Sequence, residues 1–129
     1  MQAALAAYFF RRRRAWDIHV YTEQRIKRRG GKYMIPDICV VQGSAPAEQV
    51  FTTPPLLWIE ILSPEDRPVR IQRKVREALE FGTPYVWVID PETLESELHT
   101  AQGSEPVPDG VLRIAGTAIV VPLKQVFED

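Results

Sequence analysis

The chain has 129 residues, of which 45% are hydrophobic and 26% charged, with a formal net charge of −1 at pH 7. This length supports one domain with a modest core and is too short for two, so we predict a single domain over residues 1–129. No apolar run approaches the roughly 20 residues of a membrane span, which excludes a transmembrane protein.

Two features of the sequence indicate a cytoplasmic location. The apolar start of the chain precedes its positive cluster, which is the wrong order for a signal peptide. Cys39 is the single cysteine, so it has no disulfide partner within the chain, and it is expected to be a small core residue.

The small net charge hides an uneven distribution. Residues 1–32 contain nine Lys or Arg and two Asp or Glu, whereas residues 33–129 contain seven and fifteen. A basic first third could neutralise phosphates, and an acidic remainder could hold a divalent cation. The alternative is that the basic residues form a solvated helix face.

The first third is predicted to contain a helix over about residues 2–13 and a strand over about residues 16–27. The helix is rich in alanine and ends in the run Arg11–Arg14, and the strand is indicated by alternating residue types. Gly30 and Gly31 then form a turn.

Two strongly apolar strands are expected over about residues 35–42 and 56–62, joined by a loop of Gly, Ser, Pro and Ala residues. A helix follows Ser63-Pro64 and ends near residue 81, because Gly82 and Pro84 stop it. The remaining predicted strands cover about 85–89, 94–100, 111–115 and 118–121, with turns at Gly103 and 106–110. This order predicts an α/β fold with a central mixed β-sheet flanked by helices.

Two carboxylates interrupt the apolar strands and are the best candidates for a site. Asp37 lies in Ile-Pro-Asp-Ile-Cys-Val-Val, and Glu60 lies in Leu-Leu-Trp-Ile-Glu-Ile-Leu. An acid in an apolar strand is costly to desolvate unless a metal, a hydrogen-bond donor or water compensates it. If the two strands are neighbours, strand parity lets the carboxylates converge at one end of the sheet, close enough for one Mg²⁺ to bridge them.

Lys74 is the third candidate, on the helix after the second acidic strand. The helical period places it at the margin of the apolar stripe, from which it could reach inward. A lysine near two acids and a metal can orient a water and stabilise charge on a phosphate. The alternative is a lysine whose stem covers the helix flank while its ammonium stays in water.

These residues carry a resemblance to a known family. The sequence Pro36-Asp37, the block Glu60–Pro64, Lys74 and the block Phe81–Pro91 occur together in this order. The set resembles the Uma-two family of the PD-(D/E)XK restriction-endonuclease-like superfamily, over about residues 5–121. The resemblance implies a restriction-endonuclease-like core and metal-dependent phosphodiester hydrolysis.

The resemblance also implies roles for individual residues. Asp37 and Glu60 would bind Mg²⁺, or Mn²⁺ in its place, with the main-chain carbonyl of Ile61 as a third ligand. The superfamily lysine would lie at position 62, where this chain has Leu62, so Lys74 is the matching residue on the next helix. The ammonium must reach the attacking water, and a long side chain can do so from a different backbone position.

A second departure concerns the first helix, which carries an additional acid in many superfamily members. Residues 1–15 contain no Asp or Glu, and we therefore expect the chain to begin inside that helix, without its usual preceding segment. Glu23 is a candidate substitute, with a surface strand role as the alternative. This departure weakens the prediction of activity and leaves the fold unaffected.

Other residues that could carry chemistry are assigned structural roles. His19 and His99 lack zinc-ligand spacing, and Ser63 has no accompanying triad. Asp90 with Pro91 is expected to end a strand in a turn. The three tryptophans, Trp16, Trp58 and Trp87, could stack on bases. A core position is expected for Trp58 and Trp87, because both lie within apolar strands.

The sequence therefore supports two hypotheses. The first is a Mg²⁺-dependent endonuclease that cuts DNA or another nucleic acid, with phosphate contacts from Arg11–Arg14 together with Arg25, Lys27, Arg28 and Arg29. The second is a nucleic-acid-binding or assembly module that keeps the fold with little catalysis. Edge strands in the tail could pair between subunits, so a homodimer is predicted.

Overall fold

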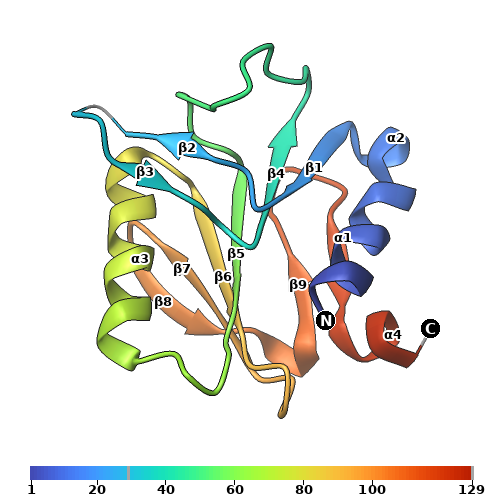
Figure 1. Ribbon diagram of the computed structural model, residues 1–129. Helices are drawn as coiled ribbons and strands as arrows, with labels where there is room; N and C mark the ends of the chain where they lie inside the picture. The colour runs from blue at the N-terminus through green and yellow to red at the C-terminus, as the bar shows by residue number, and fades with distance from the viewer. Residues whose placement is uncertain (29, 129) are drawn as a thin grey trace.

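The structure, a computed structural model, describes residues 1–28 and 30–128. Its centre is a mixed sheet of six strands: β1 (Ile18–Thr22), β4 (Ile38–Gln42), β5 (Leu57–Ile61), β6 (Tyr85–Ile89), β7 (Ser96–Thr100) and β8 (Gly103–Pro106). The spatial order is β1-β4-β5-β6-β7-β8, as can be followed in Figure 1. β5 and β6 are parallel and the other neighbours are antiparallel, which confirms the predicted α/β fold with a mixed sheet.

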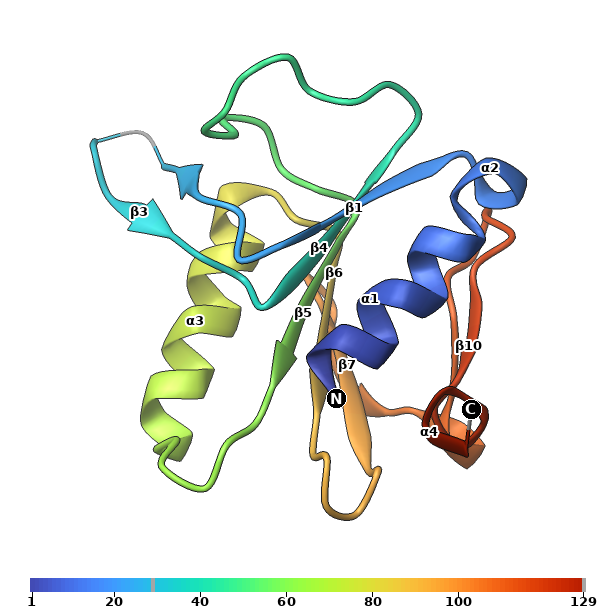
Figure 2. The same cartoon turned by 45° about the vertical axis from the view of Figure 1, so that its right-hand side comes forward.

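Helices cover both faces of this sheet (Figure 2). The smaller elements are α1 (Gln2–Arg11), α2 (Arg13–Trp16), β2 (Ile26–Lys27), β3 (Tyr33–Met34), a 3₁₀ turn η1 (Pro108–Gly110), β9 (Val111–Arg113), β10 (Val120–Pro122) and α4 (Leu123–Glu128). The longest helix, α3 (Pro68–Phe81), connects β5 to β6 and covers one face. α1, α4 and the β9-β10 hairpin cover the other face. Within the described chain, no helix is long and apolar enough to cross a membrane.

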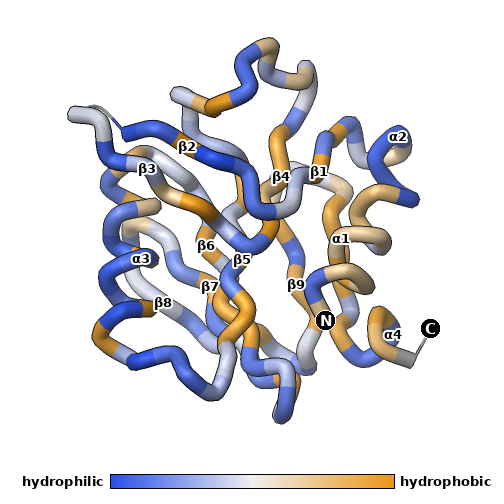
Figure 3. Tube along the Cα trace, in the orientation of Figure 1, coloured by the Kyte–Doolittle hydropathy of each residue, from blue (hydrophilic) through white to orange (hydrophobic). Residues whose placement is uncertain are grey.

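Strand alternation divides the interior into two cores. Leu57 and Ile59 of β5 pack toward α1 and α4, whereas Trp58 packs toward α3 with Cys39 and Val75. Figure 3 accordingly shows apolar segments in the central strands of the sheet. The parity predicted for the two acidic segments is confirmed, because Cys39 and Trp58 share the side that faces α3.

The prediction of one strand over residues 16–27 was wrong. Trp16 belongs to α2, and Asp17 then adopts a left-handed conformation with φ 53° before β1 begins. Glu23 also has a positive φ, 50°, which ends β1 and separates it from β2. Alternation of residue types reports which side chains share a face but does not detect such single-residue reversals.

The tail differs from prediction in two places, and the first acid lies slightly outside its predicted strand. Gly103 and Pro106, expected in turns, begin and end β8, where an edge position tolerates both residue types. α4 was not predicted, because six residues are too few for a helical period. Asp37 precedes β4, which begins at Ile38.

Gly82 ends α3 as the sequence predicts. Its φ of 113° is left-handed, and its N–H donates to the carbonyl of Leu79 at 3.0 Å. A Cβ at this position would lie 3.0 Å from Cγ of Pro54, in the loop before β5. Only glycine satisfies both the backbone conformation and this close approach.

We therefore expect Gly82→Ala to lower the free energy of unfolding by roughly 1–3 kcal/mol, through backbone strain and the contact with Pro54. Gly116→Ala is the matched control, because Gly116 has φ 77° but open space around its Cβ position. Chemical denaturation of both variants would measure the difference. Equal losses would show that the contact with Pro54 contributes nothing.

Candidate active site

The pairing of β4 with β5 brings the two predicted acids together. The antiparallel register places Ile38 opposite Ile59, so the next residues along, Asp37 and Glu60, face each other where β4 begins and β5 ends. Both acids line a pocket of about 460 Å³, and Lys74 lines it from α3. The three side chains singled out from the sequence thus share one cavity.

Glu60 is the most deeply buried charged group of this pocket, with only 2% of its surface exposed. Trp58 donates its indole N–H to Oε1 of Glu60 at 2.9 Å, and Nζ of Lys74 lies 3.8 Å from Oε2. Burial raises the pKa of Glu60 to about 7; the Trp58 hydrogen bond lowers it, the charge of Asp37 raises it, and the charge of Lys74 lowers it. Desolvation and the second acid therefore outweigh the two stabilising contacts.

Asp37 is half-buried and is held by the neighbouring strand. Its Oδ2 accepts the backbone N–H of Ile61 at 2.7 Å. Continuing the register places Pro36 opposite Ile61, and proline has no N–H to offer the Ile61 carbonyl. On the β4 side, the Ile61 carbonyl oxygen therefore receives no backbone hydrogen bond from Pro36.

These contacts leave a consistent set of oxygen atoms for a cation. One oxygen of each carboxylate is held by a neutral donor, Oδ2 of Asp37 by the Ile61 N–H and Oε1 of Glu60 by the Trp58 indole, which leaves Oδ1 of Asp37 and Oε2 of Glu60 free of these two donors. Two carboxylates and a carbonyl are hard oxygen donors, which suit Mg²⁺ or Mn²⁺ completed by water. Burial and, to a smaller extent, the charge of Asp37 raise the pKa of Glu60, and a divalent ion would offset both effects.

Lys74 reaches this pocket from the middle of α3. Its side chain is 44% exposed, and its ammonium nitrogen lies 3.8 Å from Oε2 of Glu60. No other ion pair to Glu60 is found in residues 1–28 and 30–128. The prediction that Lys74 could reach inward from its helix is thus met in geometry: its ammonium lies beside Glu60 and it lines the pocket.

Comparison with models of protein families gives a match over residues 1–122 to Uma2, described as "Putative restriction endonuclease". The chain belongs to the Uma2 family. This confirms the resemblance drawn from the Pro36-Asp37, Glu60–Pro64, Lys74 and Phe81–Pro91 segments. Family membership and fold together support a nuclease. A comparison with curated proteins found no match.

A similar solved structure comes from Anabaena variabilis and is described as "a putative nuclease belonging to DUF820". It superimposes with a TM-score of 0.80 at 22% sequence identity, covering 98% of this chain and 78% of that one. At this identity the likeness is one of fold. It agrees with the restriction-endonuclease-like fold expected for a Uma2 protein.

Sequence reasoning missed three contributors to the pocket. Trp58 was assigned to the core, where it lies, but its indole also orients Glu60. The sequence feature that could have indicated this contact is the two-residue spacing of Trp58 and Glu60, which places both side chains on one face of the strand. Asp66 lines the pocket and accepts the Ser63 N–H at 2.8 Å. Gln2 lines it from the first turn of α1, on the helix that carries an acid in many superfamily members.

Other candidates lie apart from the pocket. Glu23 is exposed and does not line it, although its backbone N–H donates to the Asp37 carbonyl at 3.1 Å. Arg12 and Arg13 stack on the rings of Tyr8 and Phe10, at 3.5 and 3.8 Å from the ring centroids. Arg29 lies outside the described residues.

Cys39, Trp87 and Asp90 occupy the core and turn positions expected of them. Cys39 is buried, and burial raises the pKa of its thiol to about 12, which makes it an inert core residue. Trp87 is fully buried, and Asp90 accepts the N–H of Glu92 in a turn at 2.9 Å. No group of three or more His, Cys, Asp or Glu residues suited to a metal occurs in the part of the chain that the structure describes.

The buried carboxylate predicts a specific dependence of stability on pH. Because the folded-state pKa of Glu60, about 7, exceeds its ordinary value of 4.5, the folded protein holds this proton more tightly than the unfolded chain. The stability of the metal-free protein should therefore fall as pH rises from about 4.5 to 7. Glu60→Gln should remove this fall and, at pH 8, stabilise the protein by on the order of 2 kcal/mol.

Denaturant unfolding in EDTA at pH 4.5 and pH 8 measures this effect. Glu105→Gln, at an exposed acid of β8, is the control and should keep the wild-type pH dependence. If Glu60→Gln also kept it, Glu60 would not carry the buried charge that the geometry indicates.

Proposed function

We propose that this chain is a divalent-metal-dependent endonuclease that hydrolyses phosphodiester bonds of DNA. The observation that carries the proposal is the convergence of Asp37, Glu60 and Lys74 in one pocket, where β4 begins and β5 ends. One oxygen of each acid accepts a hydrogen bond that orients the carboxylate, from the Trp58 indole or the Ile61 N–H, and the other oxygen would bind the cation. Membership of the Uma2 family, described as above, supports hydrolysis of nucleic acid.

Asp37, Glu60 and the Ile61 carbonyl would hold Mg²⁺, with Mn²⁺ as an alternative. When bound, the ion would polarise the phosphate and lower the pKa of an attacking water. The chain itself prepares this site: the Trp58 indole and the Ile61 N–H fix the two carboxylates, so little reorganisation is needed when the substrate arrives.

Lys74 would orient the attacking water and stabilise the negative charge that develops on the phosphate. Its ammonium approaches Glu60 at 3.8 Å while 44% of the side chain is exposed, so it can contact both the pocket and an incoming substrate. An ammonium beside the scissile phosphate lowers the barrier most when water is partly excluded, as it is around Glu60.

The predicted homodimer belongs to the same proposal. β8 forms one edge of the sheet, and all four of its residues are exposed, so its backbone is accessible to another strand. Paired subunits would place two pockets on one duplex and allow both strands to be cut.

A nucleic-acid-binding module with little catalysis is the second candidate. The observation that favours it is the pocket wall supplied by α1, where Gln2 stands and residues 1–15 contain no acid. A neutral amide offers one acceptor oxygen but no charge, so a metal would be held more weakly than by three carboxylates. The retained Asp37, Glu60 and Lys74 favour the enzyme.

Nicking of supercoiled plasmid in Mg²⁺, combined with thermal melting in Mn²⁺, tests the proposal. The wild type should nick plasmid and melt at a higher temperature in Mn²⁺. Asp37→Asn should lose both effects. Lys74→Gln should keep the Mn²⁺-induced rise and lose at least roughly 100-fold in cleavage rate, because it removes charge stabilisation without removing a ligand.

Lys124→Gln, on α4 across the sheet, is the control and should behave as the wild type. Metal-induced stabilisation without plasmid cleavage in the wild type would favour the binding module. Retained cleavage in Lys74→Gln would exclude Lys74 from the chemistry.

A further inference from the structure

α3 presents a strongly basic flank beside the pocket. Arg67, at the N-cap, and Arg70, Arg73 and Lys74 within the helix are all exposed. Arg67, Arg70 and Lys74 are spaced three and four residues apart and therefore share one side of the helix. Lys74, the last of the four, already reaches Glu60, so this flank leads directly out of the pocket.

The three arginines of this flank are available to a ligand. Ion pairs within residues 1–28 and 30–128 join Arg28 to Glu80, Lys32 to Glu77 and Lys74 to Glu60, and none involves Arg67, Arg70 or Arg73. Their side chains also make no hydrogen bond to the described residues. Arg67 and Arg70 can therefore bind phosphate without first breaking another contact, whereas the charge of Arg73 also acts on Glu77, one turn further along α3.

The run Arg11–Arg14 is placed less favourably. Arg12 and Arg13 stack on aromatic rings and donate to the carbonyls of Tyr8 and Phe10 at 3.1 and 2.8 Å. Gln2, which lines the pocket, is at the opposite end of α1, and ten helical residues span about 15 Å. The run therefore lies at the end of α1 remote from the pocket, as Figure 2 shows for α2.

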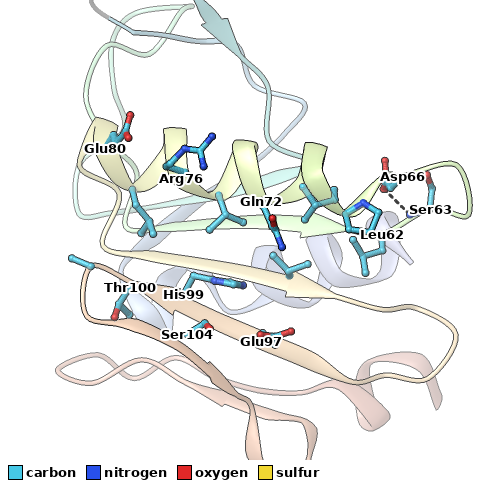
Figure 4. Close-up of a pocket in the computed structure, with 16 residues that line it drawn as sticks. Leu62, Ser63, Asp66, Gln72, Arg76, Glu80, Glu97, His99, Thr100 and Ser104 are labelled. Carbon is cyan, nitrogen blue, oxygen red and sulfur yellow. Dashed lines mark hydrogen bonds between the residues drawn. The ribbon is translucent and has the colours of Figure 1, made fainter.

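The other flank of α3 borders a groove that disfavours phosphate. This groove, about 760 Å³ in volume, lies between α3 and strands β6, β7 and β8 (Figure 4). Its lining includes three acids, Asp66, Glu80 and Glu97, and a single arginine, Arg76. Its floor is apolar, with Ile71, Val75, Leu79 and Val88. The two sides of α3 thus differ in charge.

We propose that the phosphate backbone of the DNA substrate runs along the flank of α3 formed by Arg67, Arg70 and Arg73 and enters the pocket past Lys74. The eight residues from Arg67 to Lys74 span about 10 Å of helix axis, comparable with three successive phosphates of one strand at about 3.4 Å each. This assigns nucleic-acid affinity to α3 instead of Arg11–Arg14, and it rests on the proposed nuclease function.

The test compares two double variants that remove the same charge from exposed arginines. Binding of a fluorescent DNA duplex is measured by anisotropy over a salt titration, in EDTA to prevent hydrolysis. Arg70→Gln/Arg73→Gln should flatten the slope of log K against log salt by about 1.8, because each lost phosphate contact removes about 0.9. Arg11→Gln/Arg14→Gln should retain the wild-type slope.

Within α3, Arg70→Gln should weaken binding more than Arg76→Gln, whose arginine faces the groove. Unchanged slopes in Arg70→Gln/Arg73→Gln, a reduced slope in Arg11→Gln/Arg14→Gln alone, or no DNA binding by the wild type would overturn the proposal. Thermal melting confirms that each variant is folded.

A second readout separates this proposal from the proposed function. Bis(4-nitrophenyl) phosphate is a phosphodiester too small to contact both the pocket and the helix flank. Its Mg²⁺-dependent hydrolysis should be equal in the wild type and in Arg70→Gln/Arg73→Gln. If the wild type does not hydrolyse it, the nuclease function is in question, while the salt slopes still decide whether α3 binds DNA.

Discussion

The structure depends on one unfavourable interaction, the burial of the Glu60 carboxylate on the face of the sheet that packs against α3. Apolar residues occupy most of that face. An indole N–H and the ammonium of a partly exposed lysine reduce the free-energy cost of desolvating this acid. These contacts do not fully offset its cost, because the pKa of Glu60 remains near 7. An acid placed this way destabilises the empty protein and gains most when a cation binds, so we interpret the cost as preparation of a metal site.

The sheet explains why so few residues can build this site. Antiparallel pairing of β4 with β5 sets Asp37 against Glu60, while β5 and β6, being parallel, require a crossover helix, which brings Lys74 over the same strand end. The β4-β5 register and the βαβ connection together determine the pocket. The same connection gives α3 one flank beside the pocket and another beside an apolar groove, which is the basis of the proposed DNA path.

Much of this arrangement follows from the sequence. The apolar runs predicted the central strands, the alternation within them predicted that Asp37 and Glu60 could converge at one end of the sheet, and the helical period predicted that Lys74 could reach inward. The sequence could not locate the reversals at Asp17 and Glu23, because nothing in residue type distinguishes these left-handed residues from extended ones. It also could not reveal the bond between the Ile61 N–H and Asp37, since backbone donors carry no signal in sequence, or separate the stacked Arg12 from the free Arg70.

The most direct test of this account is a crystal structure of the protein soaked in Mn²⁺, with the ion located by its anomalous scattering. We predict one ion in contact with Oδ1 of Asp37, Oε2 of Glu60 and the Ile61 carbonyl, with Trp58 and the Ile61 N–H still bonded to the other carboxylate oxygens. An ion bound elsewhere, with Asp37 and Glu60 bound only to water or to Lys74, would contradict the account.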